Sequence, residues 1–180
     1  MGVLNMILVI MGGSCSGKTV FALDCVEYGF PKVITNTTRE RRVDDKDDSY
    51  NFLTVDEFKA KIDNGEMIEY IKYNNNYYGS SVDSLSKNCT IVLEPNGYRA
   101  LKGLMPDKVL GILLDVSDEE RLRRGLLRGD KEETIKSRII EDKELFNEDL
   151  KKEVDYLFRD LKLEDNKAVI EGHLYAFKTL

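Results

Sequence analysis

The feature that most constrains this chain is the stretch VIMGGSCSGKTVF at residues 9–21, where small residues join an aliphatic run to a helix-like run. Gly12, four further residues, Gly17, Lys18 and Thr19 fit the pattern G-x-x-x-x-G-K-[ST]. In that pattern glycines let successive main-chain N–H groups point at phosphate oxygens, and a helix N-terminus adds partial positive charge. The stretch predicts a strand, a phosphate-binding loop and a helix.

The loop residues have distinct expected roles. Lys18 is expected to reach the terminal phosphates of a nucleotide, and Thr19 to offer its hydroxyl to Mg²⁺. We interpret Cys15 as a small loop residue. The alternative is a glycine-rich turn that matches the pattern by coincidence, which the flanking strand and helix patterns argue against. The residues expected to bind phosphate are Gly12, Gly13, Ser14, Cys15, Ser16, Gly17, Lys18 and Thr19.

Beyond the loop, aliphatic runs of strand length alternate with longer amphipathic segments, which is typical of an α/β fold with a parallel sheet. The runs at 4–10, 90–93 and 109–114 are apolar throughout and predict strands buried on both faces. A weaker run spans 156–158. Helices are expected at 96–104, 117–127 and 132–150, the last two separated by Gly129 and Asp130.

The section at 50–78 follows a different pattern, with short alternating stretches around one expected helix at 55–62. It predicts a small inserted β-rich subdomain. The chain has 180 residues, which suits one domain with a substantial core, and it contains no repeat or proline-rich linker.

Charge and cysteine content limit the classes of partner and compartment. The chain has 27 Lys and Arg against 33 Asp and Glu, a balance of -6, which argues against a nucleic-acid or membrane-surface binder. Cys15, Cys25 and Cys89 show no metal-ligand spacing and are expected to be free thiols in a reducing compartment. The apolar start lacks a basic leader and is interpreted as a buried strand, so a cytoplasmic location is expected.

The second motif is a basic cluster, TNTTRERR, at residues 35–42. Such a run is often an exposed, solvated turn. Arginine forks also grip phosphate bidentately, and a transferase needs a second anionic substrate held against the first. Arg39 and Arg42 are the candidates for that role, and Arg41 is expected at the surface.

The segments TTRERR, YNFLTVDEFKAKIDNGEMIEY and NNNYYGSS resemble, in order and spacing, the nucleoside-monophosphate subdomain of the guanylate kinase family. With the phosphate loop and residues 121–138, the resemblance covers nearly the whole chain. It implies a single α/β P-loop kinase domain, 1–180, with a five-stranded parallel core sheet flanked by helices. It places the core at 1–34, 82–122 and 139–180, a β-rich GMP-binding subdomain at 35–81 and a helical lid at 123–138.

The resemblance also implies how the acceptor nucleotide is bound. Tyr50 and Tyr78 would join the two arginines in holding the GMP phosphate, with Ser80 beside them. Glu69 would accept hydrogen bonds from guanine, assisted by Thr35 and Glu94. The residues expected to bind GMP are Thr35, Arg39, Arg42, Tyr50, Glu69, Tyr78, Ser80 and Glu94.

The third basic segment is RLRRGLLRGDKEETIKSR at 121–138. Intrahelical ion pairs are a sufficient explanation for Arg121 and Arg123. By the resemblance, three other arginines of this segment would close over the ATP phosphates, where charge develops during phosphoryl transfer. The expected catalytic residues are Lys18, Arg39, Arg42, Arg124, Arg128 and Arg138.

The sequence departs from the family pattern at four places, and one of them is Thr35, where family members often have serine. The loop after Arg42 is acidic and one residue short, so either Asp44 or Asp45 could replace a family glutamate. Val92 and Glu94 stand where the family tends to have two aspartates, and Val92 has no oxygen for Mg²⁺. Asp115 could substitute for it or cap the following helix. Arg159 replaces a common asparagine near adenine and would stack on the base or face solvent.

The implied activity is transfer of the γ-phosphate of ATP to GMP or dGMP, with Mg²⁺. The alternatives are a noncatalytic binding module of the same superfamily and a kinase for another nucleoside monophosphate. A GTP switch or simple ATPase fits less well, because NKAV at Asn166 lacks the aspartate of an NKxD motif. The expected partners are small nucleotides, without nucleic acid or membrane, and the expected state is a monomer or homodimer.

Overall fold

The computed structural model describes residues 6–41, 50–73 and 75–179. They belong to two compact units: unit 1 comprises Met1–Lys32 and Lys87–Leu180, and unit 2 comprises Val33–Ser86. A single segment of the chain thus forms unit 2, and the two segments that flank it form unit 1.

Unit 1 is built on a parallel sheet of four strands in the order β6-β1-β7-β8. Their bounds are Ile7–Met11 for β1, Cys89–Val92 for β6, Val109–Asp115 for β7 and Tyr156–Arg159 for β8. All five residues of β1 are buried, and so are the first six of β7. The prediction that the runs at 4–10, 90–93 and 109–114 form buried strands is confirmed for their described residues, and so is the α/β class. Strand β8, from the weaker run, is half-buried.

The predicted fifth core strand is wrong for the described residues. Beyond β6 the chain makes one isolated parallel bridge between Lys32 and Thr90, next to a hydrogen bond from the Thr90 N–H to the Pro31 carbonyl at 2.9 Å. Pro31 has no N–H to extend a ladder, and the chain enters unit 2 directly after Lys32. The segment is therefore too short to form a strand.

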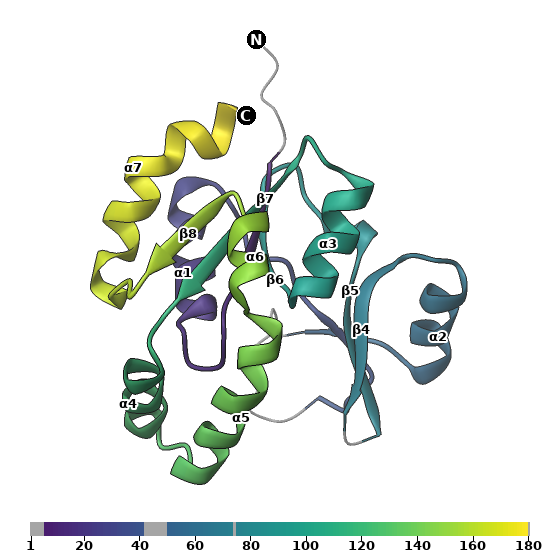
Figure 1. Cartoon of the computed structure of the whole chain (residues 1–180). Helices are drawn as coiled ribbons and strands as arrows, with labels where there is room; N and C mark the ends of the chain where they lie inside the picture. The colour runs from purple at the N-terminus through teal and green to yellow at the C-terminus, as the bar shows by residue number, and fades with distance from the viewer. Residues whose placement is uncertain (1–5, 42–49, 74, 180) are drawn as a thin grey trace. The chain divides into compact units, whose positions relative to one another are not determined.

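Helices cover both faces of this sheet (Figure 1). On one face Leu8, Ile10 and Ile112 form a core with Phe21 of α1 (Lys18–Asp24) and Phe177 of α7 (Asn166–Thr179). Helix α1 continues directly into the 3-10 helix η1 (Cys25–Tyr28), which contacts α7. The result is a packed layer that positions the start of α1, which follows the phosphate loop, against the sheet.

On the opposite face α3 (Pro95–Leu104) packs on β7 through Tyr98. A Cβ on Gly111 would lie 2.7 Å from two ring carbons of Tyr98, so the close approach of this ring requires glycine. Burial raises the pKa of the Tyr98 phenol to about 12, and its hydroxyl donates to the Glu153 carbonyl at 3.2 Å.

Three more helices follow β7: α4 (Asp118–Arg128), α5 (Glu132–Leu145) and α6 (Glu148–Glu153). Gly129, at φ 93°, ends α4 as predicted. The predicted single helix at 132–150 is divided instead. The Asn147 side-chain oxygen accepts hydrogen bonds from the N–H groups of Asp149 and Leu150, both at 3.1 Å, and so starts a new helix. The 3-10 helix η3 (Leu163–Asp165) precedes α7.

Unit 2 contains its own sheet, with strand order β3-β2-β5-β4. The bounds are Asn36–Thr37 for β2, Asn51–Phe52 for β3, Met67–Tyr73 for β4, Asn76–Ser81 for β5, Val55–Asp63 for helix α2 and Val82–Ser84 for the 3-10 helix η2. Phe58 of α2 is buried and stacks on Tyr77 of β5, with ring centroids 5.3 Å apart. The helix thereby packs on one face of the sheet.

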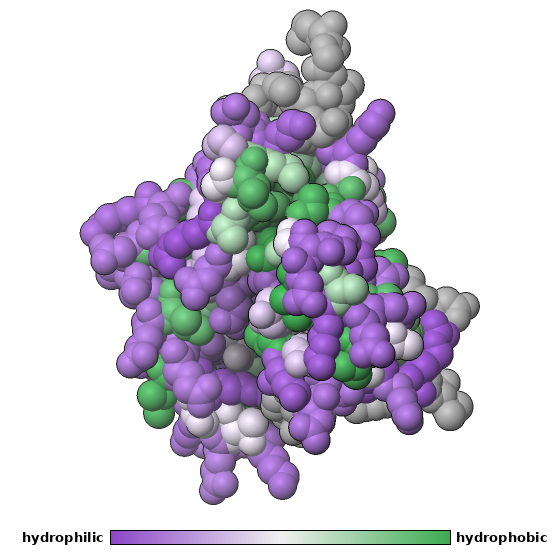
Figure 2. All heavy atoms as spheres, turned by 90° about the vertical axis from the view of Figure 1, so that its right-hand side faces the viewer, coloured by the Kyte–Doolittle hydropathy of each residue, from purple (hydrophilic) through white to green (hydrophobic). Residues whose placement is uncertain are grey.

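Hydrophilic side chains cover most of the face drawn in Figure 2, and apolar side chains form smaller patches among them. None of the helices in the described residues is both long enough and apolar enough to span a membrane. Cys15, Cys25 and Cys89 keep their thiols and form no disulfide in the described part of the chain, as predicted. Burial raises the pKa of Cys25 to about 12, so this thiol stays protonated.

Candidate active site

The candidate phosphate loop connects the end of β1 to the start of α1. Gly12 (φ 149°) and Gly17 (φ 99°) adopt left-handed backbone angles that favour glycine, and Gly17 is the residue that precedes α1. A Cβ on Gly12 would also lie 2.7 Å from the Leu114 carbonyl oxygen. The predicted strand, loop and helix are present, and the two glycines of the pattern are required by the backbone.

Lys18 is held inside this loop. Its Nζ donates to the main-chain carbonyl oxygens of Gly12 at 2.5 Å and Gly13 at 2.9 Å. Burial lowers the pKa of the Lys18 ammonium, while the carboxylates of Asp142 and Glu94 act in the opposite direction. An anion bound in the loop would favour the charged form of this side chain.

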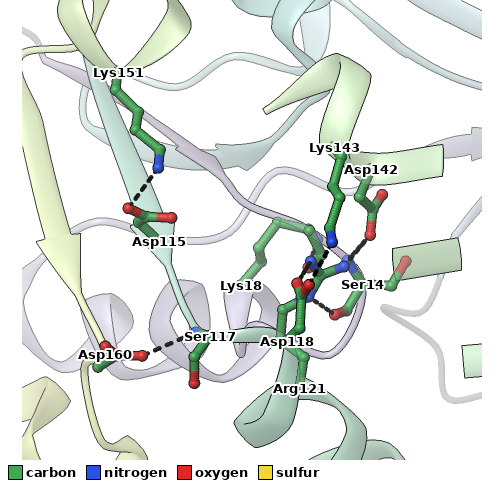
Figure 3. Close-up of polar contacts among 11 residues, drawn as sticks. Ser14, Lys18, Asp115, Ser117, Asp118, Arg121, Asp142, Lys143, Lys151 and Asp160 are labelled. Carbon is green, nitrogen blue, oxygen red and sulfur yellow. Dashed lines mark hydrogen bonds and ion pairs between the residues drawn. The ribbon is translucent and has the colours of Figure 1, made fainter. Parts of the chain in front are cut away.

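Ser14 is fixed by two side chains that the sequence analysis did not select. The Ser14 N–H donates to Oδ2 of Asp142 at 2.7 Å, and the Ser14 carbonyl accepts from Nε of Arg121 at 2.8 Å. Arg121 and Asp142 also form an ion pair with each other (Figure 3). No spacing rule could find this pair, because α4 and α5 carry its members 21 positions apart.

Next to the loop lies a cavity of about 340 Å³. It brings the loop together with all three arginines expected to contact the ATP phosphates. Its walls also include two apolar side chains. The lining residues are Ser14, Cys15, Ser16, Gly17, Lys18, Thr19, Val20, Arg124, Arg128, Arg138 and Leu163.

The arginines in this cavity are held to different degrees. The guanidinium of Arg124 donates to the Ser16 carbonyl at 2.9 Å, the Leu161 carbonyl at 2.8 Å and the Glu120 carboxylate at 2.7 Å. Its side chain is only 9% exposed. Arg128 is 60% exposed and pairs with Asp130. Arg124 is therefore preorganised on the loop, whereas the more exposed Arg128 contacts the loop through Sγ of Cys15, at 3.6 Å.

The remaining arginines of the 121–138 segment differ from each other. Arg123 forms the predicted intrahelical pair, with its Nε 2.6 Å from Glu120. Arg121 lies 3.5 Å from Asp118 within the same helix, but it is buried and its closer partners are Ser14 and Asp142. The intrahelical explanation is thus sufficient for Arg123 and incomplete for Arg121.

In unit 2 several of the residues expected to bind GMP lie together. The Arg39 guanidinium lies 5.5 Å from the Tyr50 ring centroid, and the rings of Tyr50 and Tyr78 are 6.1 Å apart. Glu69 of β4 is paired directly with the buried Ser80 of β5. Glu69, Tyr78 and Ser80 thus lie on strands of the small sheet, and Arg39 and Tyr50 lie in the segments next to β2 and β3.

Of the other residues singled out in the sequence of unit 2, Thr35 and Arg41 are described by the structure. Thr35 is half-buried, and its carbonyl accepts a hydrogen bond from the Asn51 N–H at 3.0 Å. Arg41 is exposed, as predicted, and lies 4.9 Å from the Phe52 ring centroid. Arg42, together with both acidic candidates for the family glutamate, Asp44 and Asp45, lies outside the described residues.

Unit 2 also has a cavity of about 600 Å³. Of the residues predicted to bind GMP, Tyr50 lines this cavity. The lining residues are Asn36, Arg41, Tyr50, Asn51, Phe52, Leu53, Lys61, Asp83 and Ser84.

The residues of unit 1 at which the sequence departs from the family pattern have different surroundings. Val92 packs against the core, and Glu94 is exposed at the residue that precedes α3. Asp115 pairs with Lys151 at 2.9 Å and lies 3.7 Å from Nε of Arg159, which is 68% exposed. Asp115 is thus engaged in ion pairs, and Arg159 faces solvent.

Asn166, which begins the NKAV motif, has a structural contact. Its side-chain nitrogen donates to the Asp24 carboxylate at 2.9 Å and so ties α7 to α1. It is buried, at 1% exposure.

Comparisons with known proteins agree on one family. The family model described as "Guanylate kinase" matches residues 5–174. A guanylate kinase of Lactococcus lactis subsp. lactis is 34% identical over 188 residues, covering 95% of this chain and 89% of the relative. One from Clostridium acetobutylicum is 34% identical over 152 residues, covering 80% of this chain and 72% of the relative.

A solved structure gives the same result. The crystal structure of guanylate kinase from Anaplasma phagocytophilum is similar with a TM-score of 0.68 and 25% sequence identity. The similarity covers 99% of this chain and 88% of that one.

Proposed function

This chain belongs to the guanylate kinase family, and we propose that the loop of unit 1 and the polar set of unit 2 bind its two nucleotides. The chain is an ATP-dependent enzyme that transfers the γ-phosphate of ATP to GMP, giving ADP and GDP.

ATP is assigned to the loop and the adjoining cavity. The main-chain N–H groups after Ser14 are proposed to bind the phosphates, because the Ser14 N–H itself donates to Asp142. Lys18 would leave the loop carbonyls and contact the terminal phosphates. Arg124, Arg128 and Arg138 line the same cavity and would stabilise the charge that develops on the transferred group.

Mg²⁺ is assigned to Thr19, which lies in the cavity wall on the first turn of α1. Its hydroxyl is an oxygen ligand of the kind that this cation prefers. A magnesium ion held there would supply positive charge that offsets the negative charge on the nucleotide phosphates. Val92 is an apolar core residue and supplies no ligand.

GMP is assigned to unit 2. Arg39 with Tyr50 and Tyr78 would hold its phosphate, with Arg42 as a further candidate, and Ser80 would lie beside Glu69 as their strand pairing places them. Glu69 would accept from the guanine ring N–H and amino group, with Thr35 of the same unit assisting. An adenine base leaves those acceptors unpaired, at a cost of about 1 to 3 kcal/mol each.

Phosphoryl transfer in this scheme depends on positioning and electrostatics. The acceptor is already an anionic phosphate oxygen, so no general base is needed. We assign residues 35–81 as the GMP-binding subdomain and 123–138 as a lid that excludes water and limits ATP hydrolysis. The cytoplasm is the proposed location, and a monomer or homodimer without nucleic acid or membrane the proposed state.

The observation that carries the ATP assignment is the cavity in which Lys18 and three separate arginines meet. The experiment is ADP release from ATP with a panel of nucleoside monophosphates. ADP should form stoichiometrically with GMP and stay near background with AMP, CMP or UMP. ADP formation without an acceptor would instead indicate a hydrolase, and activity with another acceptor a different kinase.

The guanine assignment has its own test in Glu69→Gln. This variant keeps the size of the side chain and replaces one acceptor with a donor. We expect the ratio of kcat/KM for GMP over AMP to fall about 10- to 200-fold, for a loss of about 1 to 3 kcal/mol. Tyr70→Phe, on the same strand and 47% exposed in its native form, is the control. An unchanged ratio in Glu69→Gln would refute the assignment.

A further inference from the structure

Arg121 is the one charged residue that is buried in the described part of unit 1, at 6% exposure. Its partner Asp142 has a side chain that is only 13% exposed. A buried charge is costly unless it is paired and hydrogen-bonded. This ion pair lies beside the phosphate loop, where Ser14 provides hydrogen-bond partners for both of its members.

The pair binds both main-chain groups of a single residue. Asp142 accepts from the Ser14 N–H at 2.7 Å, and Arg121 donates to the Ser14 carbonyl at 2.8 Å. The ion pair closes the ring, as Figure 3 shows. Ser14 is thus fixed in position and orientation by two helices that meet at this point.

Gly13 makes this arrangement possible. A Cβ on Gly13 would lie 2.4 Å from Cζ and Nη2 of Arg121. Gly13 is not among the glycines with left-handed φ angles, so its backbone would accept a side chain. Glycine is required here by the guanidinium that packs against it.

The pair also connects the loop to the arginines of the cavity. Arg121 lies one turn before Arg124 on α4, and Asp142 lies one turn after Arg138 on α5. Fixing Arg121 and Asp142 on Ser14 therefore fixes the rotation and height of both helices relative to the loop. Arg124 and Arg138 both line the cavity that results.

We propose that Arg121 and Asp142 are positioning residues for phosphoryl transfer, which hold Ser14 and thereby place the phosphate loop against Arg124 and Arg138. This inference deepens the proposed ATP site and rests on it. The pair acts through other residues, so its loss should affect turnover more than the binding of GMP in unit 2.

The decisive variant is the double substitution Arg121→Leu with Asp142→Leu. Apolar replacements of a buried ion pair are often neutral or stabilising, whereas removal of one partner leaves a buried charge unpaired. We expect each single variant to melt at a lower temperature and the double variant to recover most of that loss. Turnover of the double variant should nevertheless stay about 10- to 100-fold below that of the native enzyme, with KM for GMP unchanged.

An exposed ion pair elsewhere in unit 1 provides the matched control. Arg99 and Glu153 lie 2.8 Å apart with side chains 45% and 39% exposed. Replacing both with Leu should leave turnover at the native level. Native turnover in the Arg121→Leu, Asp142→Leu variant would overturn the proposal, because the pair would then serve stability alone.

Asp142→Asn keeps the size and one acceptor oxygen while removing the charge, and it provides the conservative test. Its turnover should lie between those of the native enzyme and Asp142→Ala, again with KM for GMP unchanged. This series gives the answer even where the double Leu variant does not fold. Equal turnover in Asn, Ala and native forms would overturn the proposal.

A melting experiment tests the geometry without any assay of activity. Gly13→Ala should lower the melting temperature of the native chain, and it should cause little further loss in Arg121→Ala, where the obstructing guanidinium is gone. Equal losses in both backgrounds would show that Arg121 does not pack on Gly13. If the native chain released no ADP with GMP, that result would refute the assigned activity. The melting comparison would still report on the packing of Arg121 against Gly13, because it does not depend on activity.

Discussion

At the scale of single residues, Lys18 combines partial burial with positive charge. Its ammonium is satisfied by two loop carbonyls, yet burial still lowers its pKa. A charge placed in this way is stabilised by a phosphate that approaches the loop, and most strongly when negative charge grows on the transferred group.

Lys18→Met should therefore reduce turnover about 10²- to 10³-fold, the usual cost of one electrostatic contact to a transition state. Single-turnover ADP formation is the measurement. Lys152→Met is the control, because the Lys152 side chain is 76% exposed and pairs with Asp149 on α6. Normal turnover in Lys18→Met would contradict the assigned role.

The same residue predicts a pH dependence. The pKa of Lys18 is lowered in the free protein, and bound triphosphate should raise it by favouring the charged form. Binding thus takes up a proton, and affinity for ATP should fall as the pH rises through the lowered pKa towards 10.5, the ordinary value for lysine. Calorimetric titration at several pH values checks this, and the profile of Lys18→Met should be flatter.

At the scale of elements, α2 carries its own start signal. The Thr54 hydroxyl accepts from the Glu57 N–H at 3.2 Å, and the Glu57 carboxylate accepts from the Thr54 N–H at 2.7 Å. Thr54→Ala should lower the free energy of unfolding by about 0.5 to 2 kcal/mol. Urea unfolding followed by circular dichroism measures it. Thr54→Ser keeps the hydroxyl and should be close to the native protein, so equal losses in both variants would contradict the capping role.

Helix α4 predicts an acid-dependent change. Glu120 accepts hydrogen bonds from Arg123 and Arg124, which lower its pKa from 4.5 to about 2. Because the folded pKa is the lower one, the stabilising contribution is present above pH 4.5 and is lost as the pH falls towards 2. The stability difference between the native protein and Glu120→Gln should shrink across that window. Unfolding at four pH values measures it, and a constant difference would count against the bond network.

At the scale of the whole molecule, the two residue sets belong to different compact units. Two nucleotides should therefore give two separate protection patterns in amide hydrogen exchange. A nonhydrolysable ATP analogue should protect the loop and α4, and GMP should protect β4 and β5. UMP at the same concentration is the control. Protection of the loop by GMP alone, with none in unit 2, would contradict the assignment.

Much of the fold and of the ATP site can be predicted from the sequence. The phosphate loop, the buried strands and the helix break at Gly129 depend on residues that are contiguous or regularly spaced, so local backbone and burial rules are sufficient to predict them. The division of the expected helix at 132–150 was missed because Asn147 competes for the backbone with a side-chain bond that periodicity does not register.

The sequence alone determined the class of fold, the loop and the family, because these are carried by residue types at fixed spacing along the chain. Tertiary structure decided which charges meet. Arg121 and Asp142 lie on different helices, and only their packing brings both to Ser14 and makes Gly13 necessary. It also reduced the fifth strand to one bridge at Lys32. Contacts between distant segments depend on how elements pack, and no local pattern encodes that.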